Sequence, residues 1–135
     1  MACNIEHINP QQLHHNPAFT NVVRVSGNAT TVYIGGQNAV NAQGEVVGVG
    51  NLHAQAEQAF ENLQIALASA GAKLEHVVKW HIYVVQGQPG HTGFQVFRRV
   101  WGTRPNPPAI TMNYVAGLAH PDFLIEIDAT AVIPE

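Results

Sequence analysis

The spacing of apolar residues along this chain predicts two helices. Between residues 51 and 70 they recur at three- and four-residue steps, which is typical of one face of an α-helix. Asn51 suits the N-cap, and Gly71 suits the position just past the helix end. A second helix is predicted over residues 93–102. The first stripe consists of Leu52, Ala56, Ala59, Leu63, Ala66 and Ala70 with Leu67 beside it, and the second of Phe94, Phe97 and Trp101.

Shorter runs rich in valine, isoleucine and aromatic residues predict strands. Residues 1–20 are polar and turn-rich, and the prolines of residues 104–108 exclude a helix there. The order of elements favours an α+β fold, in which two helices pack on one face of a mixed sheet and the other face is covered or polar. The predicted strands span residues 22–25, 30–35, 76–85, 109–116 and 123–132, with a short one near 45–47.

The composition fits one domain over residues 1–135, with 46% hydrophobic residues to form a core. Charged residues make up only 11%, well below the roughly 25% of typical domains, which favours burial of surface in an oligomer. The net charge is −3, and the six Lys and Arg residues form no basic stripe. We therefore expect no nucleic-acid partner.

The beginning of the chain has neither a basic nor an apolar signal-peptide region, and no apolar run approaches the 18 residues of a membrane span. A single cysteine, Cys3, excludes an internal disulfide and fits a reducing compartment. These features predict a cytoplasmic protein without a membrane partner.

Cofactor signals are weak. The eight histidines form no His-Glu-x-x-His motif and no Cys/His cluster, so we expect no metal. The glycines at positions 48 and 50 lack the third glycine and the βαβ unit of a dinucleotide site. We expect no cofactor.

Several segments, in the same order along the chain, resemble the Rid/YjgF family of enamine/imine deaminases. The resemblance implies a chorismate-mutase-like fold, a homotrimer whose sheets pack into a barrel, and small-molecule clefts for carbonyl or imine compounds at the subunit interfaces. It lies in residues 16–19, 32–37, 55–63, 71–72 and 77–84 and in the tail segments 108–112 and 124–131.

The resemblance gives Glu126 the role of positioning and activating water. Strand alternation places Glu126 and Asp128 on one face and Ile125 and Ile127 on the other. The alternative is a solvated strand face. The remaining cleft residues implied by the resemblance are Phe19, Gly35, Gly36, Gln37, Ile110, Thr111 and Met112.

Ile110 is the main departure from the family pattern, which has an arginine there to hold a substrate carboxylate. Isoleucine cannot form that bidentate pair, so we expect poor activity on amino-acid-derived imines and a more apolar cleft. Arg104 and Arg24 are candidate substitute anchors, since either could reach a cleft built between subunits, with solvated surface charge as the alternative. The sequence leaves open a divergent deaminase or related hydrolase, and a non-catalytic small-metabolite binder or sensor.

Overall fold

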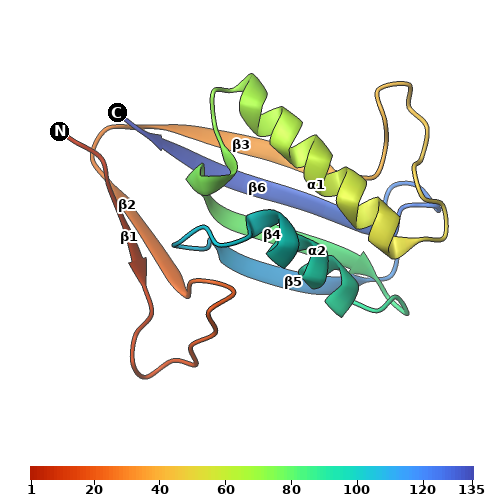
Figure 1. Cartoon of the computed structure of the whole chain (residues 1–135), viewed down its shortest axis with the longest axis horizontal. Coiled ribbons are helices and arrows are strands. Elements are labelled where there is room, and N and C mark those ends of the chain that lie inside the picture. Colours follow the sequence, from red (N-terminus) through yellow and green to blue (C-terminus); the bar gives the residue numbers. More distant parts are fainter.

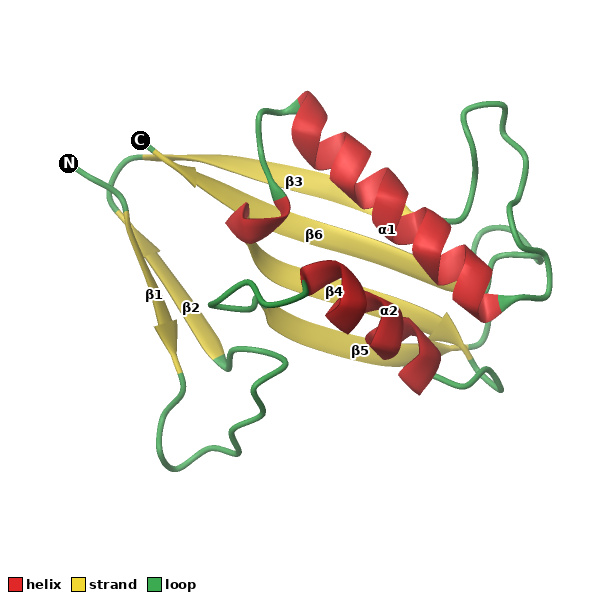
Figure 2. Ribbon diagram, in the orientation of Figure 1, coloured by secondary structure: helices red, strands yellow, loops and turns green.

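The computed structural model describes all 135 residues. Two helices lie side by side on one face of a four-stranded sheet, and a separate two-stranded hairpin stands at an angle to it near the chain termini (Figures 1 and 2). The elements are β1 (Asn4–Ile8), β2 (Val22–Ser26), β3 (Ala29–Gln37), α1 (Leu52–Ser69), the 3₁₀ turn η1 (Leu74–His76), β4 (Val77–Val85), α2 (His91–Trp101), β5 (Ala109–Val115) and β6 (Ile125–Pro134).

The sheet has the strand order β3-β6-β4-β5. Strand β6 pairs antiparallel with both β3 and β4, whereas β4 and β5 run parallel and are connected through α2. The chain therefore has the α+β architecture with a mixed sheet that its pattern predicts. None of the helices combines the length and apolar character needed to cross a membrane.

The core lies between the helices and the sheet. On β4, every second side chain is buried, namely Trp80, Ile82 and Val84. The Trp80 ring meets Phe60 of α1 and Phe97 of α2 edge-on, with centroid distances of 5.0 and 4.7 Å. Each helix thus contributes one phenylalanine to the same tryptophan, and these contacts fix the helix layer on the sheet.

The helices depart from prediction in detail. Phe60 and Gln55 belong to the buried face of α1, whereas Ala66 is only partly buried and Ala70 is an exposed C-cap. Ala56 and Ala59 are buried as predicted, whereas the predictions for Ala66 and Ala70 were wrong, because the buried face of α1 runs through Phe60, Leu63 and Leu67 instead. Helix α2 begins at His91, two residues earlier than predicted, after Pro89 accepts a hydrogen bond from the Thr92 amide.

The strands also differ at several ends. Strand β1 lies in the stretch predicted to be turn-rich, because pairing with β2 satisfies its backbone. The expected strand near residues 45–47 is reduced to an isolated bridge between Val40 and Val46. The last strand starts at Ile125 and runs on to Pro134, since β3 pairs with it up to that residue.

Gln55 is a buried polar link between α1 and the loop that leads into β6. Its side-chain amide donates to the carbonyls of Gly48 (3.2 Å) and Asp122 (2.8 Å) and accepts from the Leu124 amide (2.9 Å). We expect Gln55→Ala to lower the free energy of unfolding by about 2 kcal/mol, because buried groups lose their partners. Chemical denaturation measures this. The exposed Gln64→Ala change is the control, and equal losses for both would contradict the assignment.

Candidate functional site

Polar side chains gather on the sheet face that the helices leave open. On β6 these are Glu126, Asp128 and Thr130, which alternate with buried Ile125, Ile127 and Ala129. Because β4 is the neighbouring strand, His81 lies opposite Asp128 and Tyr83 opposite Glu126. This face is therefore polar, as the fold requires of a sheet face without a covering helix.

Glu126 lies against the backbone of Gly36. A Cβ atom added at Gly36 would be 2.6 Å from the Glu126 Cδ atom and 2.7 Å from its Oε2 atom, whereas one added at Gly35 would meet nothing within 4 Å. Only the second glycine is thus needed to make room for the carboxylate. The two glycines form an irregularity in β3, where the pairing with β6 shifts between Ile34 and Gln37.

Side-chain hydrogen bonds hold the segment after this bulge near the Glu126 carboxylate. The Asn38 side chain donates to the carbonyl of Ile125 (3.1 Å), the residue before Glu126. The Gln37 side-chain amide donates a hydrogen bond to the Gly35 carbonyl (3.2 Å). The structure therefore brings three predicted residues, Gly36, Gln37 and Glu126, into one region where β3 meets β6.

The centre of the open face carries an interacting set of ring and carboxylate groups. His81 stacks on Tyr83 at a centroid distance of 4.1 Å, and its Nε2 atom lies 2.6 Å from the Asn113 Oδ1 atom. Partial burial raises the pKa of Tyr83. The Asp128 carboxylate raises this pKa further through its charge and a hydrogen bond, and the Glu126 charge acts in the same direction. The neutral phenol is therefore the form that the fold favours.

We expect Tyr83 to ionise at higher pH than an ordinary tyrosine. The raised pKa adds to the free energy of unfolding below the ordinary tyrosine pKa, and this contribution is lost as pH rises through the raised pKa. Asp128→Asn should move the Tyr83 pKa down by removing a negative neighbour. An ultraviolet absorbance titration of tyrosinate measures both, with Tyr83→Phe identifying the contribution of this residue. An unchanged titration in Asp128→Asn would contradict the assigned cause.

Strand β5 presents its predicted residues to two different faces. Ile110 and Met112 pack against the core on the helix side, opposite Trp80 and Ile82 of β4. Thr111 points to the open face, where the Lys79 ammonium donates to its hydroxyl at 2.6 Å. Within one chain, Ile110 and Met112 are thus separated from Glu126 by the sheet itself.

Phe19 is half-buried beside the segment that leads into β5. The next residue, Thr20, anchors it there, since its amide donates to the Pro108 carbonyl (3.1 Å) and its hydroxyl donates to the Pro107 carbonyl. The structure therefore brings Phe19 to the Ile110 end of β5 and keeps it apart from the Glu126 region.

The two arginines considered as substitute anchors are already engaged. Arg104 donates from one guanidinium nitrogen to the carbonyls of Val100 (3.0 Å) and Trp101 (2.8 Å), where it caps the end of α2. Arg24 lies on the hairpin, 3.8 Å from the Glu6 carboxylate. Arg104 also borders a cavity of about 410 Å³ between β1 and η1, at the hairpin end of the molecule.

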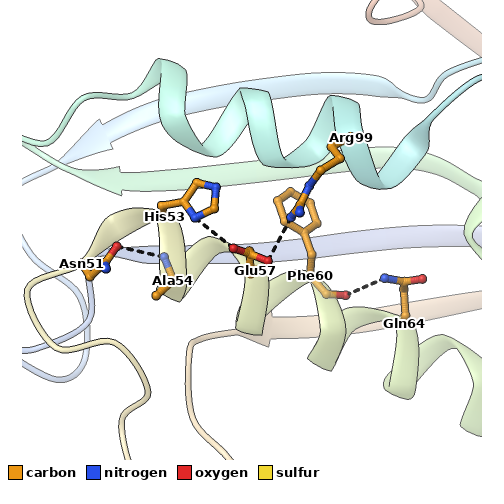
Figure 3. Close-up of polar contacts among 7 residues, drawn as sticks. All are labelled: Asn51, His53, Ala54, Glu57, Phe60, Gln64 and Arg99. Carbon is orange, nitrogen blue, oxygen red and sulfur yellow. Dashed lines mark hydrogen bonds and ion pairs between the residues drawn. The ribbon is translucent and has the colours of Figure 1, made fainter.

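The remaining arginines are neighbours on α2 with different surroundings. Arg99 reaches across to α1 and pairs with Glu57 at 3.0 Å, and Glu57 also binds His53 at 2.9 Å (Figure 3). Arg98 makes no hydrogen bond or ion pair through its side chain and borders a cavity with Phe94 and Met112. Arg98 is not among the residues singled out from the sequence, because its position beside this cavity depends on how α2 packs next to β5. The only available signal was its four-residue spacing from Phe94.

Comparison with known proteins bears on this arrangement. A family model described as Endoribonuclease L-PSP matches residues 11–133. The crystal structure of YyfB from Yersinia pestis, described as a protein of unknown function of the conserved Rid family, superposes with a TM-score of 0.84 at 36% identity, covering 96% of this chain and 99% of that one. The chain belongs to the Rid/YjgF family.

Three further proteins are similar to this chain over smaller parts of its length. The YjgF gene product of E. coli has 30% identity and a TM-score of 0.68 over 76% of this chain and 80% of that one. A RutC family protein of Synechocystis is 32% identical over 76% of this chain and 78% of its own length. A 2-iminobutanoate/2-iminopropanoate deaminase of Dermatophagoides farinae is 35% identical over 54 residues, 40% of this chain and 42% of that protein.

Proposed function

We propose that this Rid/YjgF protein hydrolyses C=N bonds of small carbonyl-derived compounds, with water activated by Glu126 in clefts between the subunits of a homotrimer. The observation that carries the proposal is the Glu126 carboxylate, which lies over Gly36 and makes no hydrogen bond or ion pair within its own chain. A carboxylate held in place by packing alone remains free to accept a proton from water.

The reaction balances without a cofactor. Glu126 takes a proton from water as the oxygen attacks the imine carbon and passes it to the nitrogen, which gives a carbinolamine. It then transfers the proton of the new hydroxyl group to the same nitrogen as the C=O bond forms and the C–N bond breaks. The products are a carbonyl compound and ammonia. Backbone N–H groups at the Gly35–Gly36 bulge, where the strand ladder is interrupted, would orient the carbonyl or imine group.

The positions of the predicted residues support a site shared between copies. Glu126 and Gly36 lie on the open face, whereas Ile110 and Met112 lie on the helix side of β5. One cleft can hold both sets only if two chains contribute. The low charge content and the 80% exposed Tyr33 side chain on β3 support an oligomer that covers the open face.

The matched family model is named after an endoribonuclease. The proposal nevertheless concerns a small-molecule substrate, because a net charge of −3 without a basic stripe provides no surface to neutralise RNA phosphates. The deaminase named among the relatives supports the reaction class, but through a match that covers less than half of that protein.

A second candidate is a non-catalytic binder of small metabolites on the same scaffold, and the apolar Ile110 favours it. The Ile110→Arg variant discriminates between the two. A gain of imine hydrolysis on introducing the guanidinium supports the catalytic function, because it shows that the other residues of the site, Glu126 among them, are competent for the reaction. Continued inactivity of both the variant and the parent protein supports the binder.

The primary test is an assay of the native protein on 2-iminopropionate and bulkier amino-acid imines, generated in situ by an amino-acid oxidase. Acceleration over spontaneous hydrolysis supports the proposal. Absence of acceleration on every imine contradicts it and leaves the binder as the remaining candidate.

We expect Gly36→Ala to lower kcat/KM for the best imine by about 100-fold, since the new methyl group displaces the Glu126 carboxylate and small misplacements are costly to catalysis. Because only the end of a flexible side chain must move, the melting temperature should change little. Gly35→Ala is the matched control and should retain activity. Equal kinetics for the two variants would argue against the Glu126–Gly36 contact as part of the site.

A further inference from the structure

The largest cavity of the molecule lies where the β1–β2 hairpin meets the end of the main sheet (Figure 1). Its volume of about 410 Å³ falls in the roughly 300–1,000 Å³ range of small-molecule pockets. Side chains of β1, η1, the first residues of β4, the last residues of β6 and the loop at residues 104–106 line it. Glu126, Gly36 and Ile110 do not, so this cavity is separate from the candidate site described above.

Two opposite charges line the cavity without pairing with each other. A backbone hydrogen bond lowers the pKa of Glu75, and the nearby charge of Arg104 lowers this pKa further, yet the three ion pairs of the chain involve other carboxylates. The Nη1 atom of Arg104 donates to two carbonyls at the end of α2, which holds the guanidinium in place and leaves Nε and Nη2 without partners. An ionised acceptor and a fixed donor therefore border one cavity, with no net charge between them.

Three uncharged polar side chains complete the polar part of the lining. Burial lowers the pKa of His7, which favours its neutral form. His76 accepts a hydrogen bond from the Lys73 amide at Nδ1 (2.9 Å), so its Nε2 atom carries the proton of the neutral ring and can donate. Asn106 has a φ of 56° and stands between two prolines, which restrict the loop. The cavity thus offers both donors and acceptors from restrained side chains.

The apolar part of the lining comes from three different strands. Ile5 of β1, Val78 of β4 and Val132 of β6 contribute to it, and Val132 is only 4% exposed. No aromatic side chain other than the two imidazoles lines the cavity. These aliphatic groups provide a dry surface for the face of a planar ring, whereas the charged groups are left to bind its edge.

A ligand that satisfies this lining is neutral and planar, with N–H donors for a carboxylate beside acceptors for a guanidinium. Guanine has this pattern, because its N1–H and N2–H groups donate on one edge while O6 and N7 accept on the adjacent edge. We propose that the cavity between the hairpin and the sheet binds a free guanine base or its nucleoside, with N1–H and N2–H donated to Glu75, O6 and N7 bound by Arg104, and the ring packed on Val78 and Val132. This site goes beyond the proposed function, because it has no part in imine hydrolysis.

The test uses guanosine as the probe in calorimetric titrations of the intact protein. Adenosine should bind more weakly, because its amino group stands where guanosine has O6 and would face the donors of Arg104. We expect Glu75→Gln to weaken guanosine binding about tenfold, as for loss of charge-assisted hydrogen bonds at an exposed site. Glu61→Gln is the matched control, since Glu61 is an exposed carboxylate of α1 that does not line the cavity.

Inosine, which lacks only the 2-amino group of guanosine, tests the assigned contact atom by atom. Native protein should prefer guanosine to inosine, and Glu75→Gln should lose this preference, a change that a purely structural role of Glu75 does not produce. Arg104→Gln should likewise lose the preference for guanosine over adenosine. Because Arg104 also caps α2, its melting temperature is measured alongside, and the comparison of two ligands on one variant stays valid if stability falls.

Four results would overturn the proposal. They are no binding of guanosine to native protein, equal weakening by Glu75→Gln and Glu61→Gln, a preference for guanosine over inosine that survives in Glu75→Gln, or tighter binding of L-leucine, a zwitterion that also presents a donor and an acceptor.

The variant Glu126→Gln separates this proposal from the proposed function, because it should bind guanosine as native protein does. Guanosine binding without imine hydrolysis upholds this site and overturns the enzyme. Imine hydrolysis without guanosine binding upholds the enzyme and overturns this site.

Discussion

Replacement of Glu126 by glutamine is expected to lower kcat/KM for imine hydrolysis by about 10²- to 10⁴-fold, the range typical for loss of a general acid or base. Glutamine has nearly the same shape as glutamate and can still fill the space over Gly36, but it cannot take a proton from water. Because the Glu126 carboxylate makes no hydrogen bond or ion pair in its own chain, the melting temperature should stay close to that of the native protein.

Asp128→Asn provides the comparison for this experiment. Asp128 lies on the same face of β6, two residues further on, and its carboxylate hydrogen-bonds Tyr83. We expect this variant to lose less than tenfold in kcat/KM, because general acid–base catalysis requires a group at the reacting atoms. Native-like turnover by Glu126→Gln, or equal losses in both variants, would remove Glu126 from the mechanism.

The largest stability effect is expected at Phe97. Its ring contacts Phe60, Trp80, Phe94 and Trp101, with centroid distances between 4.7 and 6.3 Å, and it is 1% exposed. Phe97→Ala should lower the free energy of unfolding by about 3–5 kcal/mol, since it removes buried surface and leaves a cavity. A native domain has only about 5–15 kcal/mol in total, so denaturant unfolding should show a large shift.

Ile65→Ala is the control for Phe97→Ala. Ile65 lies on α1 with 62% of its surface exposed, and alanine is favourable in a helix. We expect the control to change stability by less than about 0.5 kcal/mol. A loss for Phe97→Ala no greater than that of the control would show that the aromatic cluster does not hold α2 on the sheet.

The elements that could be predicted from sequence are those with a strong local period. The alternation through Trp80, Ile82 and Val84 and the stripe of α1 placed these segments within one or two residues. Strand β1 could not be found in this way, because its partner β2 follows only after a long connection and the pairing is non-local. Phe60 was missed because its burial depends on Trp80 and Phe97, which come from other elements.

The residues of the candidate site show the same difference between local features, which the sequence predicts, and non-local contacts, which it does not. Strand alternation is local, and it placed Glu126 on the face opposite Ile125 and Ile127, as the structure has it. The contact between Glu126 and Gly36 depends on the pairing of β3 with β6 and is not visible in either segment alone. Arg98 was missed for a related reason, since it borders a cavity only because β5 lies beside α2 at the sheet edge.

The placement of Glu126 and Ile110 on opposite faces of one sheet has a genetic consequence. When each cleft takes its carboxylate from one copy and its β5 wall from the next, a defect in one half-site leaves the other half of the same chain intact. Two alleles that are each inactive alone, one altered at Glu126 and the other on the α2–β5 side, can then restore function when co-expressed, because mixed assemblies contain some clefts built from two undamaged halves.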